Sequence, residues 1–124
     1  MVGSMTHSLS RSQIGTRGED LAADYLRGDG YTVLDRNWRC RHGEIDIIAA
    51  RDELLVFVEV KTRTGHGFGT PAEAVTYTKL RRLRRLAGIW LATQSGSWSA
   101  VRIDVIEVRL GRTAPEITHI HGVS

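Results

Sequence analysis

Two β-rich runs joined by a short polar turn constrain the fold of this 124-residue chain more than any other feature. Residues 44–50 and 54–62 carry apolar side chains at both odd and even positions, and Asp52 and Glu53 separate the two runs. Successive side chains of a strand point to opposite faces, so the runs predict a hairpin that is apolar on both faces. A sheet of this kind is usually covered on both faces. The hairpin therefore predicts an α/β domain with helices on both sides of its sheet.

The remaining segments supply the other elements of such a domain. Residues 12–28 predict a helix that ends at a Gly-Asp-Gly turn, and residues 71–93 predict a second helix that begins at Pro71. Residues 31–38 and 100–110 predict two further strands, and residues 117–120 a short edge strand. The resulting order is α-β-β-β-α-β, a mixed central sheet with helices on both faces. We expect residues 1–10 to be a flexible N-terminus or a vector-derived remnant, and residues 11–124 to form a single domain.

Composition excludes several classes of protein. The chain is 41% hydrophobic and 25% charged, which excludes a disordered, a collagen-like or a coiled-coil protein. The sequence contains no apolar run of the ~18 residues that a membrane span needs, and its first residues lack a signal-peptide core. A lone cysteine, Cys40, cannot form an intrachain disulfide and has no further feature of a nucleophile. We therefore expect a cytoplasmic protein without a membrane partner.

Carboxylates in the hairpin are the first candidates for a functional site. If the chain turns at residues 52–53, the opposed pairs are Ile48–Phe57, Asp46–Glu59 and Glu44–Lys61. Directly opposed residues have Cβ atoms roughly 4.5–5.5 Å apart, so two carboxylates would repel each other on a face that apolar neighbours mark as buried. Mg²⁺ or Mn²⁺, which prefer oxygen ligands, would relieve that repulsion. The alternative is a strand end that emerges into solvent, where charges are unremarkable.

Each predicted helix adds one residue to these candidates. Gly15, Glu19, Ala22 and Leu26 share one stripe of the first helix, where Glu19 would approach the sheet as a third carboxylate or remain a glutamate on the flank of the helix. In the second helix Lys79 lies in the middle of an apolar stripe. A lysine there must extend to solvent, pair with a carboxylate or take part in chemistry.

The use of basic residues supports a special role for the lysines. The chain has 17 basic residues, of which only Lys61 and Lys79 are lysine. Lysine is a compact charge that can sit beside a water or a phosphate oxygen, whereas arginine is a planar fork that keeps its proton. We therefore interpret both positions as ones that require lysine.

These residues resemble a known nuclease motif. Asp46, followed by Glu59-Val60-Lys61 on the adjacent strand, resembles the PD-(D/E)xK motif of restriction-endonuclease-like proteins, although Ile45 replaces the proline. The segments GTRGE at 15–19, GEIDI at 43–47 and FVEVKTR at 57–63 more closely resemble the YraN-like family of uncharacterised bacterial proteins, over roughly residues 12–110. The resemblance implies relatives similar to Holliday-junction resolvases. It implies metal binding by Asp46, Glu59, the Val60 carbonyl and Glu19, and activation of water by Lys61.

A basic segment of the second helix predicts a nucleic-acid contact. Residues 79–85 carry five positive charges, and the segment's arginines are Arg81, Arg82, Arg84 and Arg85. Phosphate contact is one interpretation, to which Arg41 and Arg63 would add, and a solvated helix face is the other. The glycine-rich loop at 65–69 and the histidines His119 and His121 are more typical of a connector and of an exposed tail.

The residues leave three hypotheses about function. The first is a Mg²⁺- or Mn²⁺-dependent endonuclease acting on DNA, with branched and single-stranded DNA among the substrates. The second is an accessory protein that binds nucleic acid and retains the nuclease fold without turnover. The third makes the arginine helix a surface for docking a protein. A resolvase that works alone needs two active sites, which is compatible with a homodimer.

Overall fold

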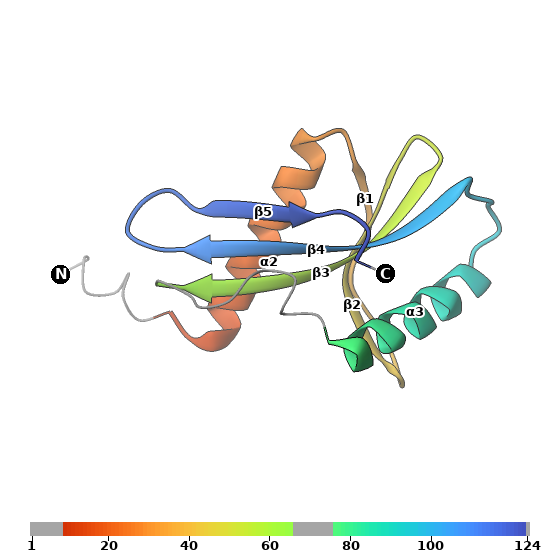
Figure 1. Cartoon of the computed structure of the whole chain (residues 1–124), viewed down its shortest axis with the longest axis horizontal. Coiled ribbons are helices and arrows are strands. Elements are labelled where there is room, and N and C mark those ends of the chain that lie inside the picture. Colours follow the sequence, from red (N-terminus) through yellow and green to blue (C-terminus); the bar gives the residue numbers. More distant parts are fainter. Residues whose placement is uncertain (1–8, 66–75, 124) are drawn as a thin grey trace.

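A five-stranded mixed sheet forms the centre of the molecule (Figure 1). The computed structural model describes residues 9–65 and 76–123. Its elements are α2 (Arg11–Gly28), β1 (Thr32–Cys40), β2 (Gly43–Arg51), β3 (Leu54–Thr64), α3 (Tyr77–Ala92), β4 (Ala100–Leu110) and β5 (Glu116–Ile120). The strands lie in the order β1-β2-β3-β4-β5. β3 and β4 are parallel and the other neighbours antiparallel, since the long connection through α3 returns the chain to the same end of the sheet.

The two helices cover opposite faces of this sheet, as the apolar hairpin predicted. α2 packs Ala22, Ala23 and Leu26 against Ile47 and Val58 and their neighbours. On the other face, α3 contributes four buried side chains to a second cluster with residues of β2 and β3. These four residues are Leu83, Leu86, Ala87 and Trp90. The α/β class and the helices on both faces are confirmed.

The register of the central hairpin is confirmed where the strands pair. Ile48 lies opposite Phe57, and Arg51 opposite Leu54, on either side of a turn in which Asp52 has a φ of 55°. The ladder runs as far as the pair Ile47–Val58. Within the described residues, neither Asp46–Glu59 nor Glu44–Lys61 is a ladder pair, so this part of the predicted register is wrong.

Two further expectations are corrected. The second helix begins at Tyr77, where the hydroxyl of the N-cap Thr76 accepts the Lys79 amide, and not at Pro71, which lies outside the described residues. Alternation placed Ile45 on the same face as Ile47, but Ile45 packs in the α3 cluster and Ile47 in the α2 cluster. The change of face coincides with Asp46, where β2 leaves the β3 ladder. Among the described residues, no helix is long and apolar enough to cross a membrane.

Candidate active site

The centre of the candidate site is Asp46, at the point where β2 and β3 stop pairing. Its Oδ2 accepts a hydrogen bond of 2.8 Å from the Val60 amide. In a continued ladder, the Val60 amide would donate to a backbone carbonyl of β2. Here it donates to the Asp46 side chain instead. This substitution is the physical reason why Asp46 and Glu59 are not a ladder pair, and it holds the Asp46 carboxylate between the two strands.

The surroundings of Asp46 favour its protonated form. Burial is the main cause, and the charge of Glu59 is the second; the Val60 hydrogen bond opposes both. Glu19 and Glu44 raise the pKa further, and the net effect brings the pKa of Asp46 to about 7. Three other carboxylates thus act on Asp46 through their charge, and the acidic cluster expected from the hairpin exists in the fold.

Glu19 reaches this cluster because α2 lies unusually close to β3. A Cβ added to Gly18 would lie only 2.8 Å from the Cβ of Thr62 and would collide with that side chain, so the close contact requires glycine. The neighbouring Glu19 side chain is 16% exposed. Its buried Oε1 has no hydrogen-bond partner among the described residues, since Arg36 Nη2 lies 3.6 Å away. Burial raises the pKa of Glu19, against the charge of Arg36 and a hydrogen bond from Asn37.

Lys79 approaches the carboxylates from the opposite face. Its Nζ lies 3.8 Å from Glu59 Oε1, and the Glu59 side chain is only 18% exposed. The sequence left three outcomes open for this lysine, and in the structure it pairs with a carboxylate. The first turn of α3, capped by Thr76, places the lysine there, while Leu83 and Leu86 bury the rest of the same stripe.

The other predicted residues lie around this centre. Lys61 is exposed two residues after Glu59 on β3, where strand alternation puts both on one face. Glu44, expected opposite Lys61, instead pairs with Arg39 across the β1–β2 hairpin at 3.2 Å. Val60 contributes its amide to Asp46, whereas the resemblance assigned a role to its carbonyl.

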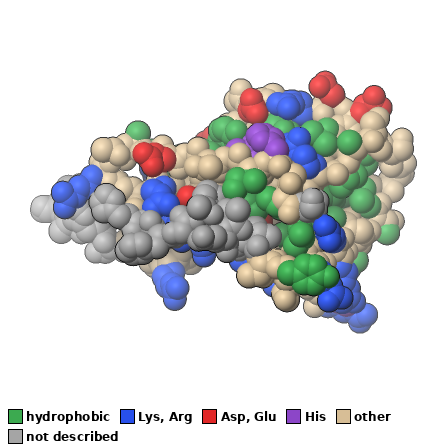
Figure 2. Space-filling model, in the orientation of Figure 1, with side chains coloured by type: hydrophobic (Ala, Val, Ile, Leu, Met, Phe, Trp, Pro, Cys, Tyr) green, Lys and Arg blue, Asp and Glu red, His purple; other side chains and the backbone are tan. Residues whose placement is uncertain are grey.

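The arginines divide into two groups. Arg81, Arg82, Arg84 and Arg85 of α3 and Arg41 of the β1–β2 turn are exposed. α3 and that turn are neighbours, since a Cβ on Gly43 would lie 3.6 Å from Arg82 Cδ. Basic side chains are also seen over α3 in Figure 2. By contrast, Arg63 and Arg36 bind carboxylates of the chain itself: Arg63 binds the buried Glu107, and Arg36 binds Asp20 at 2.7 Å.

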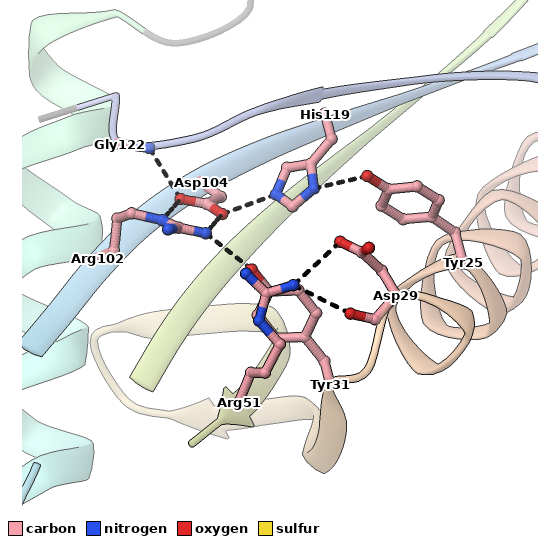
Figure 3. Close-up of polar contacts among 8 residues, drawn as sticks. All are labelled: Tyr25, Asp29, Tyr31, Arg51, Arg102, Asp104, His119 and Gly122. Atoms are coloured by element: carbon pink, nitrogen blue, oxygen red, sulfur yellow. Dashed lines mark hydrogen bonds and ion pairs between the residues drawn. The ribbon is translucent and has the colours of Figure 1, made fainter. Parts of the chain in front are cut away.

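A second polar centre, which sequence reasoning missed, lies between β4, β5 and the end of α2 (Figure 3). Asp104 is fully buried and accepts hydrogen bonds from both Nε and Nη2 of Arg102, from His119 Nε2 and from the Gly122 amide. His119 Nδ1 lies 3.0 Å from the Tyr25 hydroxyl. The one indication of this centre in the sequence was an aspartate, Asp104, inside the largely apolar run 100–110.

These contacts assign the second centre to fold stability. The His119 side chain is 3% exposed, so its interpretation as part of an exposed tail is wrong. Asp104, His119 and His121 bring potential metal ligands within 4.8 Å of one another. The rings of His119 and His121, however, stack on each other at 3.8 Å and 28°. Arg102 also occupies both Asp104 oxygens, which disfavours a cation at this position.

Comparison with known proteins places the chain in a family. The model of the uncharacterised protein family UPF0102 matches residues 18–108. The chain belongs to the UPF0102 family. A UPF0102 protein of Mycolicibacterium vanbaalenii is 63% identical over 121 residues, which are 97% of this chain and 100% of the relative. UPF0102 proteins of Mycobacterium ulcerans and Mycobacterium tuberculosis are 60% and 58% identical, over 94% of this chain and 98% and 95% of theirs.

The match confirms the resemblance to YraN-like proteins. The segment shared with the UPF0102 model begins at Gly18 and so contains Glu19, Asp46, Glu59, Lys61 and Lys79. It ends at Val108, before β5, so it excludes His119 and His121. The carboxylate centre therefore lies within the part of the chain that defines UPF0102, and half of the second polar centre lies outside it.

Proposed function

We propose that this UPF0102 protein is a nuclease of the restriction-endonuclease-like type, which hydrolyses phosphodiester bonds in DNA with Mg²⁺ or Mn²⁺. The observation that carries the proposal is the partly buried Asp46 of β2, on which the carboxylates of Glu59 on β3 and Glu19 on α2 act through their charge. Burial and the neighbouring negative charges raise the pKa of Asp46, so its ionised form does not stabilise the fold. Such an arrangement is typical of a site that a cation completes.

The residues present fit a hard divalent cation. All of their side-chain donors are carboxylate oxygens, the ligands that Mg²⁺ and Mn²⁺ prefer. The buried Glu19 Oε1 has no hydrogen bond within the described residues, but it forms an ion pair with Arg36 Nη2 at 3.6 Å, with which a bound cation would compete. The fit supports Asp46, Glu59 and Glu19 as the side chains that would hold the ion. When bound, the ion would polarise the phosphate and lower the pKa of a water molecule.

The chain's own residues would then prepare the site in three ways. The Val60 amide fixes one oxygen of Asp46. Lys79 holds the Glu59 carboxylate and offsets part of the negative charge of the cluster. Lys61, exposed on the Glu59 side of β3, would stabilise through its ammonium group the charge that develops on the phosphate.

The test separates ion binding from catalysis. Calorimetric titration with Mn²⁺ should show binding to the wild type and none to Asp46→Ala. Labelled junction, flap and single-stranded DNA should be cleaved in the presence of the metal by the wild type and not by Glu59→Gln. If the wild type fails to bind Mn²⁺, or leaves every substrate of a broad panel intact, the proposal is wrong.

A second candidate function follows from the exposed arginines of α3. These side chains, Arg81, Arg82, Arg84 and Arg85, suit the phosphate backbone whether or not the carboxylates are active. An accessory protein of this kind would bind DNA with steep salt dependence, and Asp46→Ala would keep that binding. This candidate would be contradicted if Asp46→Ala lost DNA binding, or if the affinity for DNA did not fall steeply with salt.

A further inference from the structure

Tyr77 is the most exposed of the large hydrophobic side chains in the described part of the chain. Its side chain is 72% exposed, compared with 47% for Val101, 43% for Leu9 and 42% for Leu34. Its ring presents a large, rigid apolar face to water at the start of α3.

The ring stands at the head of the arginine stripe of α3. Tyr77 and Arg81 are four residues apart, and the guanidinium carbon of Arg81 lies 5.9 Å from the centre of the Tyr77 ring. Arg84 and Arg85 continue the same face at the next turn, since they follow Tyr77 by seven and eight residues. Figure 2 shows hydrophobic surface beside basic side chains in the region of α3.

This face is distinct from the side of α3 that packs on the sheet. Leu83, Leu86 and Trp90 are buried on the packed side. Lys79, which contacts Glu59, follows Tyr77 by two residues, which is about 200° around the helix. The lysine therefore projects on the packed side of α3, and Tyr77 with the arginines on the outer side.

We propose that Tyr77 is a stacking platform for an unpaired nucleobase, and that Arg81, Arg84 and Arg85 bind the phosphates of the same single strand. An aromatic ring beside a basic track is the arrangement that binds single-stranded nucleic acid, because every base has a face that can stack. Bases of a duplex are already stacked on each other and offer no such face. The inference goes beyond the proposed function by assigning a partner, single-stranded DNA or an unpaired segment at a branch, to the outer face of α3.

The experiment measures binding in EDTA, so that neither metal binding nor cleavage affects it. Fluorescence anisotropy with a labelled single-stranded oligodeoxynucleotide and with a blunt duplex of equal length gives the two affinities at low salt. We expect the wild type to prefer the single strand. Tyr77→Ala should weaken single-strand binding by about 5- to 150-fold, the effect of losing one stacked base, and leave duplex binding unchanged.

Matched variants identify the contact. Tyr77→Phe keeps the ring and should bind like the wild type, and Val101→Ala removes an exposed apolar side chain of β4 without effect. The Tyr77 dependence should also disappear on an oligonucleotide whose bases are replaced by abasic residues. The inference is overturned if Tyr77→Ala binds the single strand as tightly as the wild type, or if it weakens duplex binding equally.

The same variants separate this inference from the proposed nuclease function. Tyr77→Ala should retain calorimetric binding of Mn²⁺, because Tyr77 supplies no carboxylate. Single-strand binding that depends on Tyr77 would stand even if the carboxylates bound no ion. Conversely, metal-dependent cleavage with no change in Tyr77→Ala would support the nuclease and contradict the stacking platform.

Discussion

The Val60 amide donates to Asp46 Oδ2 across 2.8 Å, and the β2–β3 ladder ends at this point. The bond holds a carboxylate between two strands, beside Glu59 and within the field of Glu19. Because the same carboxylate is partly buried among other negative charges, it combines a fixed position with an unfavourable charged state. Both properties can be measured.

The first prediction concerns stability and pH. Burial and the charge of Glu59 raise the pKa of Asp46 to about 7, from 3.8. The folded protein therefore keeps a proton that the unfolded chain releases near pH 4, and the free energy of unfolding falls as the pH rises from about 4 to 7. Asp46→Asn should raise the free energy of unfolding at pH 8 by about 1 to 4 kcal/mol, the upper figure being the full linkage value.

Urea denaturation at pH 5 and pH 8 checks this prediction. Little gain is expected at pH 5, where wild-type Asp46 is already mostly protonated. Asp52→Asn is the control, because Asp52 is exposed in the hairpin turn and asparagine also tolerates its positive φ. This substitution should not raise the free energy of unfolding in a pH-dependent way. An equal effect of Asp46→Asn at both pH values would contradict the assigned pKa.

The second prediction couples the proton of Asp46 to a divalent cation. An ion that binds the ionised carboxylate must displace the proton below pH 7, so the apparent affinity should fall by up to about tenfold per pH unit there. Mn²⁺ at 100 times its Kd adds about 2.7 kcal/mol to the free energy of unfolding, so the concentration that achieves this at pH 8 should raise the melting temperature less at pH 6. Scanning calorimetry at both pH values measures this, with Glu59→Gln as the variant that should lose the effect. Equal stabilisation of that variant would show that the ion binds elsewhere.

Much of the fold could be predicted because periodicity reflects local geometry. Alternation along the hairpin predicted the opposition of Ile48 and Phe57, and the 3.6-residue period predicted the burial of Ala22 and Leu26. The end of the ladder could not be predicted in this way. It depends on a side chain, Asp46, that competes with backbone for the Val60 amide, and no pattern of apolar residues records that competition.

The polar centre at Asp104 was unpredictable for a different reason. Tyr25 and His119 are 94 residues apart in sequence and meet only because α2 packs on the face of the sheet to which β5 contributes His119. The short run 117–120 around His119 did not indicate that its side chain would bind a buried aspartate and a helix residue. By contrast, the apolar stripe around Lys79 limited it to three outcomes, and one of them, pairing with a carboxylate, is the outcome in the structure.

The third prediction tests the close approach of α2 and β3. Gly18→Ala would force the new Cβ into the Thr62 side chain, so it should cost about 1 to 3 kcal/mol and weaken Mn²⁺ binding by displacing Glu19. Gly15→Ala, one turn earlier, meets no atom within 4 Å and should stabilise the helix by about 0.5 to 1 kcal/mol. Urea denaturation and calorimetry of the pair measure both effects. If the two substitutions are equivalent, Gly18 has no special role in positioning Glu19.

The fourth prediction concerns the buried carboxylate that fastens β5. Burial would raise the pKa of Asp104, but hydrogen bonds from His119, Arg102 and the Gly122 amide outweigh it and lower the pKa to about 2. A lowered folded-state pKa stabilises the protein above pH 4, and this contribution of about 2 kcal/mol is lost as the pH falls from 4 to 2. Asp104→Asn should therefore lower the free energy of unfolding at pH 7 by at least that amount and flatten its acid dependence, because Arg102 and His119 lose a charged partner.

Chemical denaturation between pH 2.5 and 7 measures both the free energy of unfolding and its acid dependence. Glu116→Gln, exposed on β5, is the control that leaves stability unchanged. Retention of the wild-type acid dependence in Asp104→Asn would mean that other carboxylates account for it.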